Sequence, residues 1–111
     1  MIISTILPTQ IQLITPQELR QKINHQSVVL IDVREKDEYD QGHIPTALLR
    51  PLSKFSPQQL QSYPNIVLYC RSGKRSHTAA EKLIAQGVNS VTELQGGISA
   101  WQDAGFAVVP N

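Results

Sequence analysis

The sequence contains very little cysteine, with a single residue in a chain of 111. One thiol cannot form an intrachain disulfide, and it also excludes a C-x-x-C redox motif or zinc site. An excess of positive charge is missing too, because ten basic residues stand against nine acidic ones. Proteins that coat nucleic acid or anionic membranes need many uncompensated cations. We therefore expect neither nucleic acid nor a membrane as a partner.

Long hydrophobic runs are also absent. No apolar stretch approaches the roughly 20 residues that cross a bilayer. The apolar start, Met1 to Leu7, lacks a basic region and is followed at once by Pro8, which is unlike a signal peptide. A single thiol without an export signal fits a reducing compartment. The sequence therefore predicts a cytoplasmic location.

Length and composition favour one globular domain. A chain of 111 residues has room for one hydrophobic core and is long enough to fold without disulfides or metals. Hydrophobic residues make up 41% and charged residues 17%, which is typical of folded proteins rather than disordered ones. We expect residues 1–10 to be a lead-in and residues 11–109 to form the domain.

Short apolar stretches alternate with helical patterns along the chain. Five segments are predicted to be strands: Ile11–Ile14, Val28–Val33, Ala47–Leu49, Ile66–Tyr69 and Val91–Leu94. Helical segments are predicted over Pro16–Asn24, Arg34–Gln41, part of Ser53–Tyr63, Arg75–Gln86 and Ile98–Ala104. Strands that alternate with helices of this length are joined by right-handed crossovers and form a mainly parallel sheet. The predicted fold class is therefore α/β.

Two of the predicted helices carry start signals. Thr15 is a natural N-cap, and Glu18 stands where it completes a capping box. In the segment Ser53–Tyr63, Ser56 is the expected N-cap, and Pro57 suits the first turn of a short helix.

The single cysteine stands directly after a predicted buried strand. Cys70 begins a loop with Gly73 at its middle, and this loop leads into the start of a helix. Ligands of α/β proteins bind beyond the carboxyl ends of the strands, and such loops can turn backbone N–H groups inward to hold an anion. A lone cysteine at a strand end is otherwise most often a small buried hydrophobic residue. The surrounding residues favour the functional interpretation.

Three cations flank that helix start: Arg71, Lys74 and Arg75. Positive charge at a helix N-terminus opposes the helix dipole and costs about 0.3–1 kcal/mol for each exposed residue. A site that receives an anion explains why the cations are there. The same surroundings favour the thiolate form of Cys70 and make it a candidate nucleophile.

A charged pair ends the second predicted strand. Asp32 and Arg34 are two positions apart, so they point to the same side of the strand. Contact with substrate is one possible role for this pair. Because buried charges are usually paired, we favour a structural role in which the pair ties the strand end to the next segment through Glu38.

The other candidates receive structural interpretations. His43 is expected to brace a turn, Trp101 to anchor the core, and Gly96 and Gly97 to supply backbone conformations. His77, in the first turns of the helix after Cys70, is a candidate for the pocket wall. No second ligand stands at metal-binding spacing from any histidine, so no metal site is predicted.

Three separated motifs resemble the rhodanese family of sulfurtransferases, as a single-domain member. The first is Asp32-Val33-Arg34 with Glu38-Tyr39 and Gly42-His43-Ile44-Pro45, the second is Cys70 to Ser76, and the third is Gly96 to Trp101. The resemblance runs from about Ile11 to Val109. It implies a five-stranded, mainly parallel sheet flanked by helices on both faces, with the catalytic loop at the strand ends.

The resemblance also implies a mechanism without cofactors. Cys70 would take sulfur from an anionic donor such as thiosulfate and pass it from a persulfide to cyanide, a thiol or a protein. The loop residues would hold the donor: Arg71, Ser72, Gly73, Lys74, Arg75 and Ser76. A monomer is expected.

Two other functions stay open. Related phosphatases and arsenate reductases have an arginine six positions after the cysteine, whereas Arg75 stands five positions after Cys70. The other open function is a module that relays sulfur from a protein donor or only binds a partner.

Thr46, Leu49 and Arg50 depart from the family pattern. Arg50 either lies near the mouth of the site or points to solvent.

Overall fold

The structure is a computed structural model that describes residues 10–111. The predicted lead-in and the apolar start at Met1 to Leu7 lie, apart from residue 10, outside the described residues. Among those described, no helix is both long enough and apolar enough to cross a membrane.

The centre of the molecule is a five-stranded sheet in the order β1-β5-β4-β2-β3, and every pair of neighbouring strands is parallel. The strands are β1 (Ile11–Ile14), β2 (Val29–Asp32), β3 (Leu48–Leu49), β4 (Ile66–Tyr69) and β5 (Val91–Leu94). Parallel neighbours need crossover connections, and helices supply most of them here. The predicted α/β fold is confirmed.

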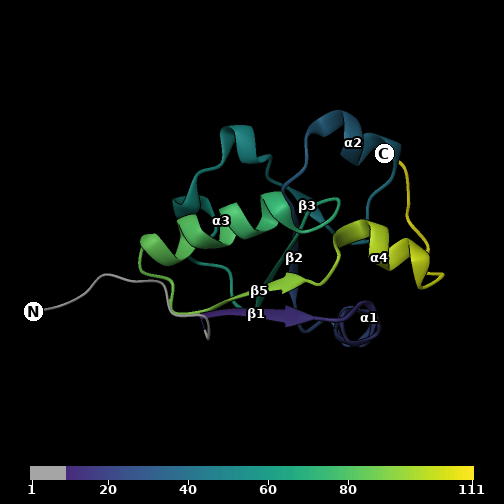
Figure 1. Cartoon of the computed structure of the whole chain (residues 1–111), viewed down its shortest axis with the longest axis horizontal. Coiled ribbons are helices and arrows are strands. Elements are labelled where there is room, and N and C mark those ends of the chain that lie inside the picture. The colour runs from purple at the N-terminus through teal and green to yellow at the C-terminus, as the bar shows by residue number, and fades with distance from the viewer. Residues whose placement is uncertain (1–9) are drawn as a thin grey trace, which may run out of the picture.

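Helices cover both faces of the sheet, which also agrees with the prediction. They are α1 (Pro16–Asn24), α2 (Lys36–Gln41), α3 (Lys74–Ala85) and α4 (Gly97–Asp103). In Figure 1, α3 lies above the strands and α1 below them. The capping box predicted for the first helix is present, since Thr15 Oγ accepts a hydrogen bond from the Glu18 N–H and Glu18 Oε1 accepts one from the Thr15 N–H.

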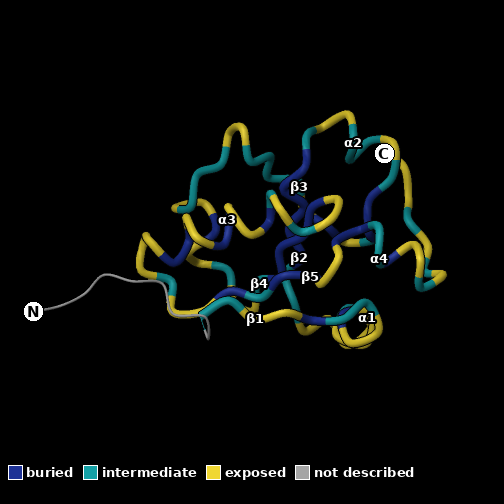
Figure 2. Tube along the Cα trace, viewed as in Figure 1, coloured by how far each residue is buried: buried dark blue, intermediate teal, exposed yellow. Residues whose placement is uncertain are grey.

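The pleat of the strands divides the core between the two faces. Leu30 and Val67 contribute to one cluster, which also holds buried residues of α1 and α4. Ile31 and Leu68, their chain neighbours, contribute to the other cluster, with buried residues of α3. Successive side chains of a strand point to opposite faces, so the buried central strands supply both clusters. Figure 2 shows β2 and β4 as the dark blue interior.

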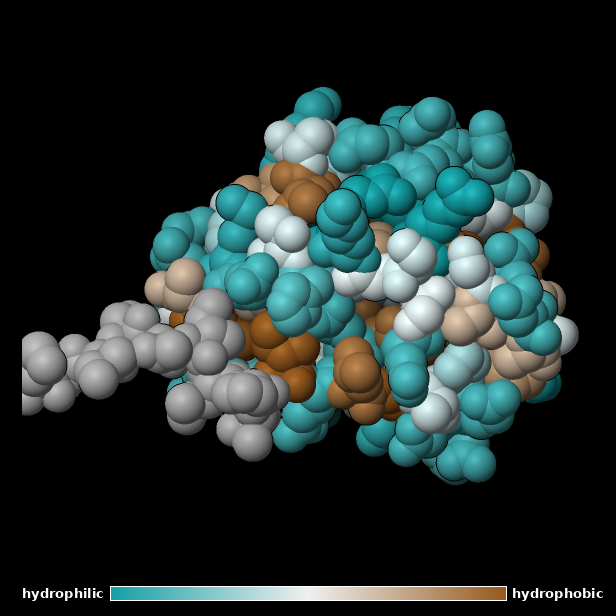
Figure 3. Space-filling view, in the orientation of Figure 1, coloured by the Kyte–Doolittle hydropathy of each residue, from teal (hydrophilic) through white to brown (hydrophobic). Residues whose placement is uncertain are grey.

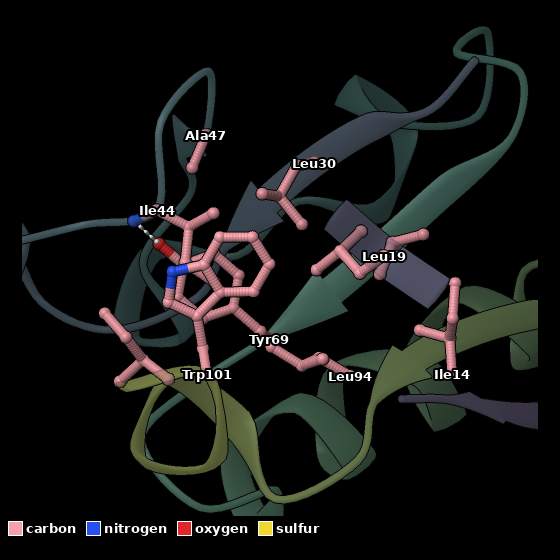
Figure 4. Close-up of a cluster of buried hydrophobic side chains, with 10 residues drawn as sticks. Ile14, Leu19, Leu30, Ile44, Ala47, Tyr69, Leu94 and Trp101 are labelled. Atoms are coloured by element: carbon pink, nitrogen blue, oxygen red, sulfur yellow. Dashed lines mark hydrogen bonds between the residues drawn. The ribbon is translucent and has the colours of Figure 1, made fainter. Parts of the chain in front are cut away.

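Trp101 lies inside the first cluster and is only 4% exposed. Its Nε1–H donates to the Ala107 carbonyl at 2.9 Å, which satisfies its polar atom. Figure 4 shows the indole among Ile44, Tyr69 and Leu94, and the dashed line marks the bond from the Ile44 N–H to the Tyr69 hydroxyl oxygen. Side chains from α4, β4 and the turn after α2 therefore meet in one packed layer.

The short helix predicted within Ser53–Tyr63 is present as a 3₁₀ helix, Pro57–Gln59, with Ser56 at its N-cap position and Pro57 in its first turn. Another 3₁₀ turn, Leu52–Lys54, precedes it. A residue before proline is pushed out of the helical region, and Ser56 is extended at φ −121° and ψ 104°. Its hydroxyl bonds to the Gln58 side chain rather than capping the turn. Leu60 is nevertheless fully buried against the face that α3 covers, so the segment packs without forming an α-helix.

Candidate active site

Cys70 follows β4 directly, near the middle of the sheet and at its carboxyl edge. The chain then turns sharply into α3, whose N-cap is Gly73. This glycine has φ +117°, a conformation that an L-residue rarely adopts. The turn places the first N–H groups of α3 around the end of β4.

The thiol of Cys70 is enclosed by the loop that follows it. The residue is 1% exposed, and its Sγ accepts a hydrogen bond from the Gly73 N–H at 3.1 Å. The thiol itself donates to Ser76 Oγ at 3.7 Å. Burial raises the pKa of Cys70, but hydrogen bonds that the thiolate accepts from the Ser76 backbone and hydroxyl and from the Gly73 and Ser72 backbones outweigh it, so the pKa falls below its ordinary value. The geometry therefore favours a thiolate at this position.

The three cations of the loop have different surroundings. Arg75 forms a two-pronged ion pair with Glu38 of α2, with Nη1–Oε1 at 2.7 Å and Nη2–Oε2 at 2.9 Å. Arg71 and Lys74 are exposed and form no ion pair with any residue in 10–111. The positive charge that remains available to an anion is therefore carried by Arg71 and Lys74.

The Arg75–Glu38 pair should make stability depend on pH. The guanidinium lowers the pKa of Glu38 from 4.5 to about 2. Because this folded-state pKa lies below that of the unfolded chain, the contribution is complete above about pH 4.5 and is lost as the pH falls towards 2. Both side chains are about one-third exposed, so we expect Glu38→Gln to cost only about 1 kcal/mol at pH 6.

Urea unfolding of wild type and E38Q, followed by circular dichroism, measures this difference. We expect it to shrink between pH 6 and pH 3. The matched control is Asp37→Asn, which removes an exposed carboxylate of α2 that forms no ion pair in the described chain. An E38Q difference that stays constant with pH would contradict the ion-pair interpretation.

Asp32 and Arg34 form a buried ion pair at the end of β2. Asp32 is fully buried, Arg34 is 6% exposed, and Nη2–Oδ2 is 2.8 Å. Burial opposes the charge of Arg34, but its hydrogen bonds to Asp32 outweigh burial and raise the pKa of the guanidinium. Nη2 also donates to the Gly42 carbonyl at 2.7 Å. The strand end is thus tied to the next turn through Gly42, whereas Glu38 bonds to Arg75.

His43 lies in that turn and is 8% exposed. Its ring stacks on Tyr39 at 3.7 Å between centroids, with Nδ1 3.0 Å from the Tyr39 carbonyl oxygen. Its backbone exchanges hydrogen bonds with Val109. These contacts fasten the turn to α2 and to the end of the domain.

Backbone hydrogen bonds join the start of α4 to the loop that follows Cys70. The Ile98 N–H donates to the Cys70 carbonyl at 2.9 Å, and the Ser99 N–H donates to the Arg71 carbonyl at 3.1 Å. Gly97 makes this approach possible, because a Cβ there would lie 2.5 Å from the Arg71 oxygen and 2.6 Å from the Cys70 oxygen. Gly96 precedes it at φ +75°. The two glycines bring the backbone of α4 against the backbone of the cysteine loop.

Sequence reasoning missed Glu93. This residue of β5 is 2% exposed, and its carboxylate lies under the first turn of α3. Ser76 Oγ donates to Oε1 at 2.9 Å, and His77 Nδ1 lies 3.0 Å from Oε2. A signal was available, because Glu93 is two residues from the buried Val91 and so shares the face that α3 covers.

Two clefts flank the cysteine loop. One, of about 610 Å³, is lined by Ser72, Gly73, His77 and Glu93, with Ile11 and Leu13 of β1 as its apolar wall. Figure 3 shows apolar side chains gathered on the face that carries β1 and β5. The second cleft, of about 440 Å³, has a polar wall that includes Arg34, Arg71 and Ser99.

His77 therefore lines the wall of a pocket beside the cysteine loop, whereas Arg50 borders neither cleft. The Arg50 Nη1 donates to the Leu49 carbonyl. Within residues 10–111, no three His, Cys, Asp or Glu side chains are grouped in a way that could hold a metal ion.

Comparison with known proteins gives a consistent result. The model of the rhodanese-like domain matches residues 15–104. An uncharacterized protein of Synechocystis sp. is 40% identical over 98 residues, which span 86% of this chain but 55% of that protein. A sulfurtransferase of Allochromatium vinosum is 38% identical over 100 residues, which span 86% of this chain and 92% of that one. Among solved structures, a rhodanese-related protein from Thermoplasma volcanium superposes with a TM-score of 0.79 at 27% identity, covering 90% of this chain and 99% of the other.

Proposed function

Because this chain belongs to the rhodanese-like domain family, we propose that it is a sulfurtransferase in which Cys70 carries the transferred sulfur. The observation that carries the proposal is the position of Cys70 Sγ. It lies within hydrogen-bond reach of the Gly73 N–H, and its pKa is lowered by the hydrogen bonds around it. A thiolate held in this way is a nucleophile for an electrophilic sulfur.

The first half-reaction uses an anionic donor such as thiosulfate. The Cys70 thiolate attacks the outer sulfur, a new S–S bond forms, and the bond between the two donor sulfurs breaks. Sulfite leaves with that electron pair, and a persulfide remains on Cys70. Arg71 and Lys74 draw the donor towards the loop, and the backbone N–H groups of the loop stabilise the anionic outer sulfur.

The second half-reaction needs an acceptor from outside the chain. Cys70 is the only cysteine of the sequence, so no second thiol of the same chain can resolve the persulfide. The acceptor is a thiophile, either a small thiol or cyanide, or a thiol of a partner protein. Two half-reactions through a covalent intermediate lead to ping-pong kinetics.

Intact-protein mass spectrometry tests the proposal directly. After incubation with thiosulfate we expect a gain of about 32 Da, the mass of one sulfur atom, which cyanide or dithiothreitol removes. The cysteine-free C70S variant, treated in parallel, should gain nothing. A protein that gains no sulfur from thiosulfate, while its thiol still reacts with an alkylating agent, would contradict this donor chemistry.

The phosphatase alternative is less well supported. Its ring needs an arginine that can bind the oxyanion, but Arg75 is bonded through both terminal nitrogens to Glu38. Arg75 also stands five positions after Cys70 rather than six.

A further inference from the structure

A continuous hydrogen-bonded chain leads from the Cys70 thiol to a buried carboxylate. The thiol lies 3.7 Å from Ser76 Oγ, and Ser76 Oγ lies 2.9 Å from Glu93 Oε1. Cys70, Ser76 and Glu93 are 1%, 0% and 2% exposed. We propose that Glu93 takes the proton of the Cys70 thiol through the Ser76 hydroxyl, so that thiolate forms without adding charge to this buried cluster.

The transfer conserves both protons and charge. The S–H bond of Cys70 breaks as its proton bonds to Ser76 Oγ, and the hydroxyl proton of Ser76 moves to Glu93 Oε1. The starting state has a neutral thiol and a carboxylate, and the final state has a thiolate and a carboxylic acid. In both states the cluster carries one negative charge. Losing the thiol proton to solvent instead would leave two negative charges on either side of one hydroxyl group, which is costly in a buried site.

The hydrogen bonds of the loop suit both states. In the first, Ser76 accepts from the thiol and donates to Glu93 Oε1 at 2.9 Å, the nearer of its two acceptors, since the Gly73 carbonyl lies at 3.1 Å. In the second, the hydroxyl donates to the thiolate, which is the arrangement that lowers the pKa of Cys70, and accepts from the protonated carboxyl. The N–H of Gly73 stabilises the thiolate. The step from Ser76 to Glu93 needs no movement of heavy atoms, whereas the 3.7 Å between Sγ and Oγ shortens for the first step.

Other charged groups lie around Cys70 and Glu93. His77 on α3 bonds to the second oxygen of Glu93, and Glu81, one turn further, lines the same cleft. Arg71 and Lys74 flank the cysteine in the loop, and Arg75 is paired with Glu38 of α2. From β1, Ile11–Ile14 brings no titratable side chain, and neither does the first turn of α4.

The relay makes a specific prediction for the titration of the thiol. Two strongly coupled sites titrate as a pair. Over an intermediate pH range Cys70 and Glu93 together hold one proton, and the distribution of this proton between them does not depend on pH. The fraction of Cys70 that is thiolate is therefore constant over that range. The ultraviolet absorbance of the thiolate, with the spectrum of Cys70→Ser subtracted, should therefore rise in two steps separated by a plateau. A single-step rise in the wild type would overturn the proposal without any further variant.

The decisive variant is Glu93→Gln, which keeps the shape and an acceptor for Ser76 but cannot take a proton. We expect its plateau to vanish, so that one pH unit below the midpoint the thiolate signal falls to about one-tenth of its maximum. If Glu93 acts only as a repelling charge, E93Q will instead show the same number of steps as wild type, moved to lower pH, and the relay is overturned.

Three further variants separate the remaining contributions. Ser76→Ala should lose the plateau, because the thiolate and the protonated carboxyl both lose the hydroxyl that bonds to them, and a retained plateau would refute the role of Ser76. His77→Gln should keep the plateau, because it removes only the imidazole, and its loss would assign the lower step to His77. Glu81→Gln is the matched control, a carboxylate of the same cleft, and it should also keep the plateau. None of these measurements depends on a sulfur donor, so failure of the relay is distinguishable from failure of the proposed sulfur transfer.

Discussion

Replacing Cys70 with serine should abolish sulfur transfer, lowering turnover by more than about a thousandfold. A hydroxyl has almost the same size as a thiol and can still accept the Gly73 N–H. It is a far weaker nucleophile, and it cannot hold a transferred sulfur as a persulfide. The steady-state formation of sulfite from thiosulfate, with cyanide or dithiothreitol as acceptor, measures the loss.

The fold should survive this change. The site already supplies polar partners for the atom at this position, in the Gly73 N–H and the Ser76 hydroxyl. We therefore expect the free energy of unfolding of C70S to lie within about 1 kcal/mol of wild type, as measured by urea denaturation. Turnover of the folded variant within tenfold of wild type would show that Cys70 is not the sulfur carrier.

Gly97→Ala should be among the most damaging single-methyl changes in the domain. The added carbon would lie 2.5 Å from the Arg71 carbonyl oxygen, and the backbone there has φ +62°. Backbone atoms cannot rotate away as a flexible side chain can. Steric overlap and the left-handed backbone together should cost about 2–5 kcal/mol of unfolding free energy.

Gly105→Ala is the control for the backbone contribution. Gly105 has φ +86°, and its added carbon would meet no atom within 4 Å. It should lose only about 1–2 kcal/mol. The change at Gly97 should also slow sulfur transfer in the protein that remains folded, since it displaces the loop of Cys70. Equal losses of stability in the two variants would mean that the contact with the loop has no energetic weight.

The sheet could be predicted because its central strands are continuous apolar segments of the sequence. Val29–Asp32 and Ile66–Tyr69 are buried on both faces, and such strands appear in a sequence as continuous apolar runs. The segment Ser53–Tyr63 was less predictable, because its apolar residues are held by packing against α3 rather than by a repeating backbone pattern. Ser56 and Pro57 indicate where the turn begins, but they do not distinguish an α-helix from a 3₁₀ turn.

The geometry of the candidate site could be predicted where neighbours in the sequence form it, but not where residues distant in the sequence meet in the fold. The loop from Cys70 to Ser76 could be found from its order of residues. The partners of Arg75 and Ser76 could not, because Glu38 and Glu93 come from positions 37 residues earlier and 17 residues later in the chain. Both partners are acidic. Glu38 binds the Arg75 guanidinium and Glu93 accepts from the Ser76 hydroxyl, two groups that the sequence alone assigns to binding the donor.

The order of the strands has a consequence for how the chain acquires its structure during synthesis. β1 is made first, yet it pairs with β5, the strand that is made last. The carbonyls of Cys70 and Arg71 likewise receive their N–H partners from Ile98 and Ser99. Contacts between such distant parts of a chain form late and slow its folding. A nascent chain that has just completed α3 thus carries a thiol whose enclosure is unfinished, and the reactive loop matures in the same step that closes the domain.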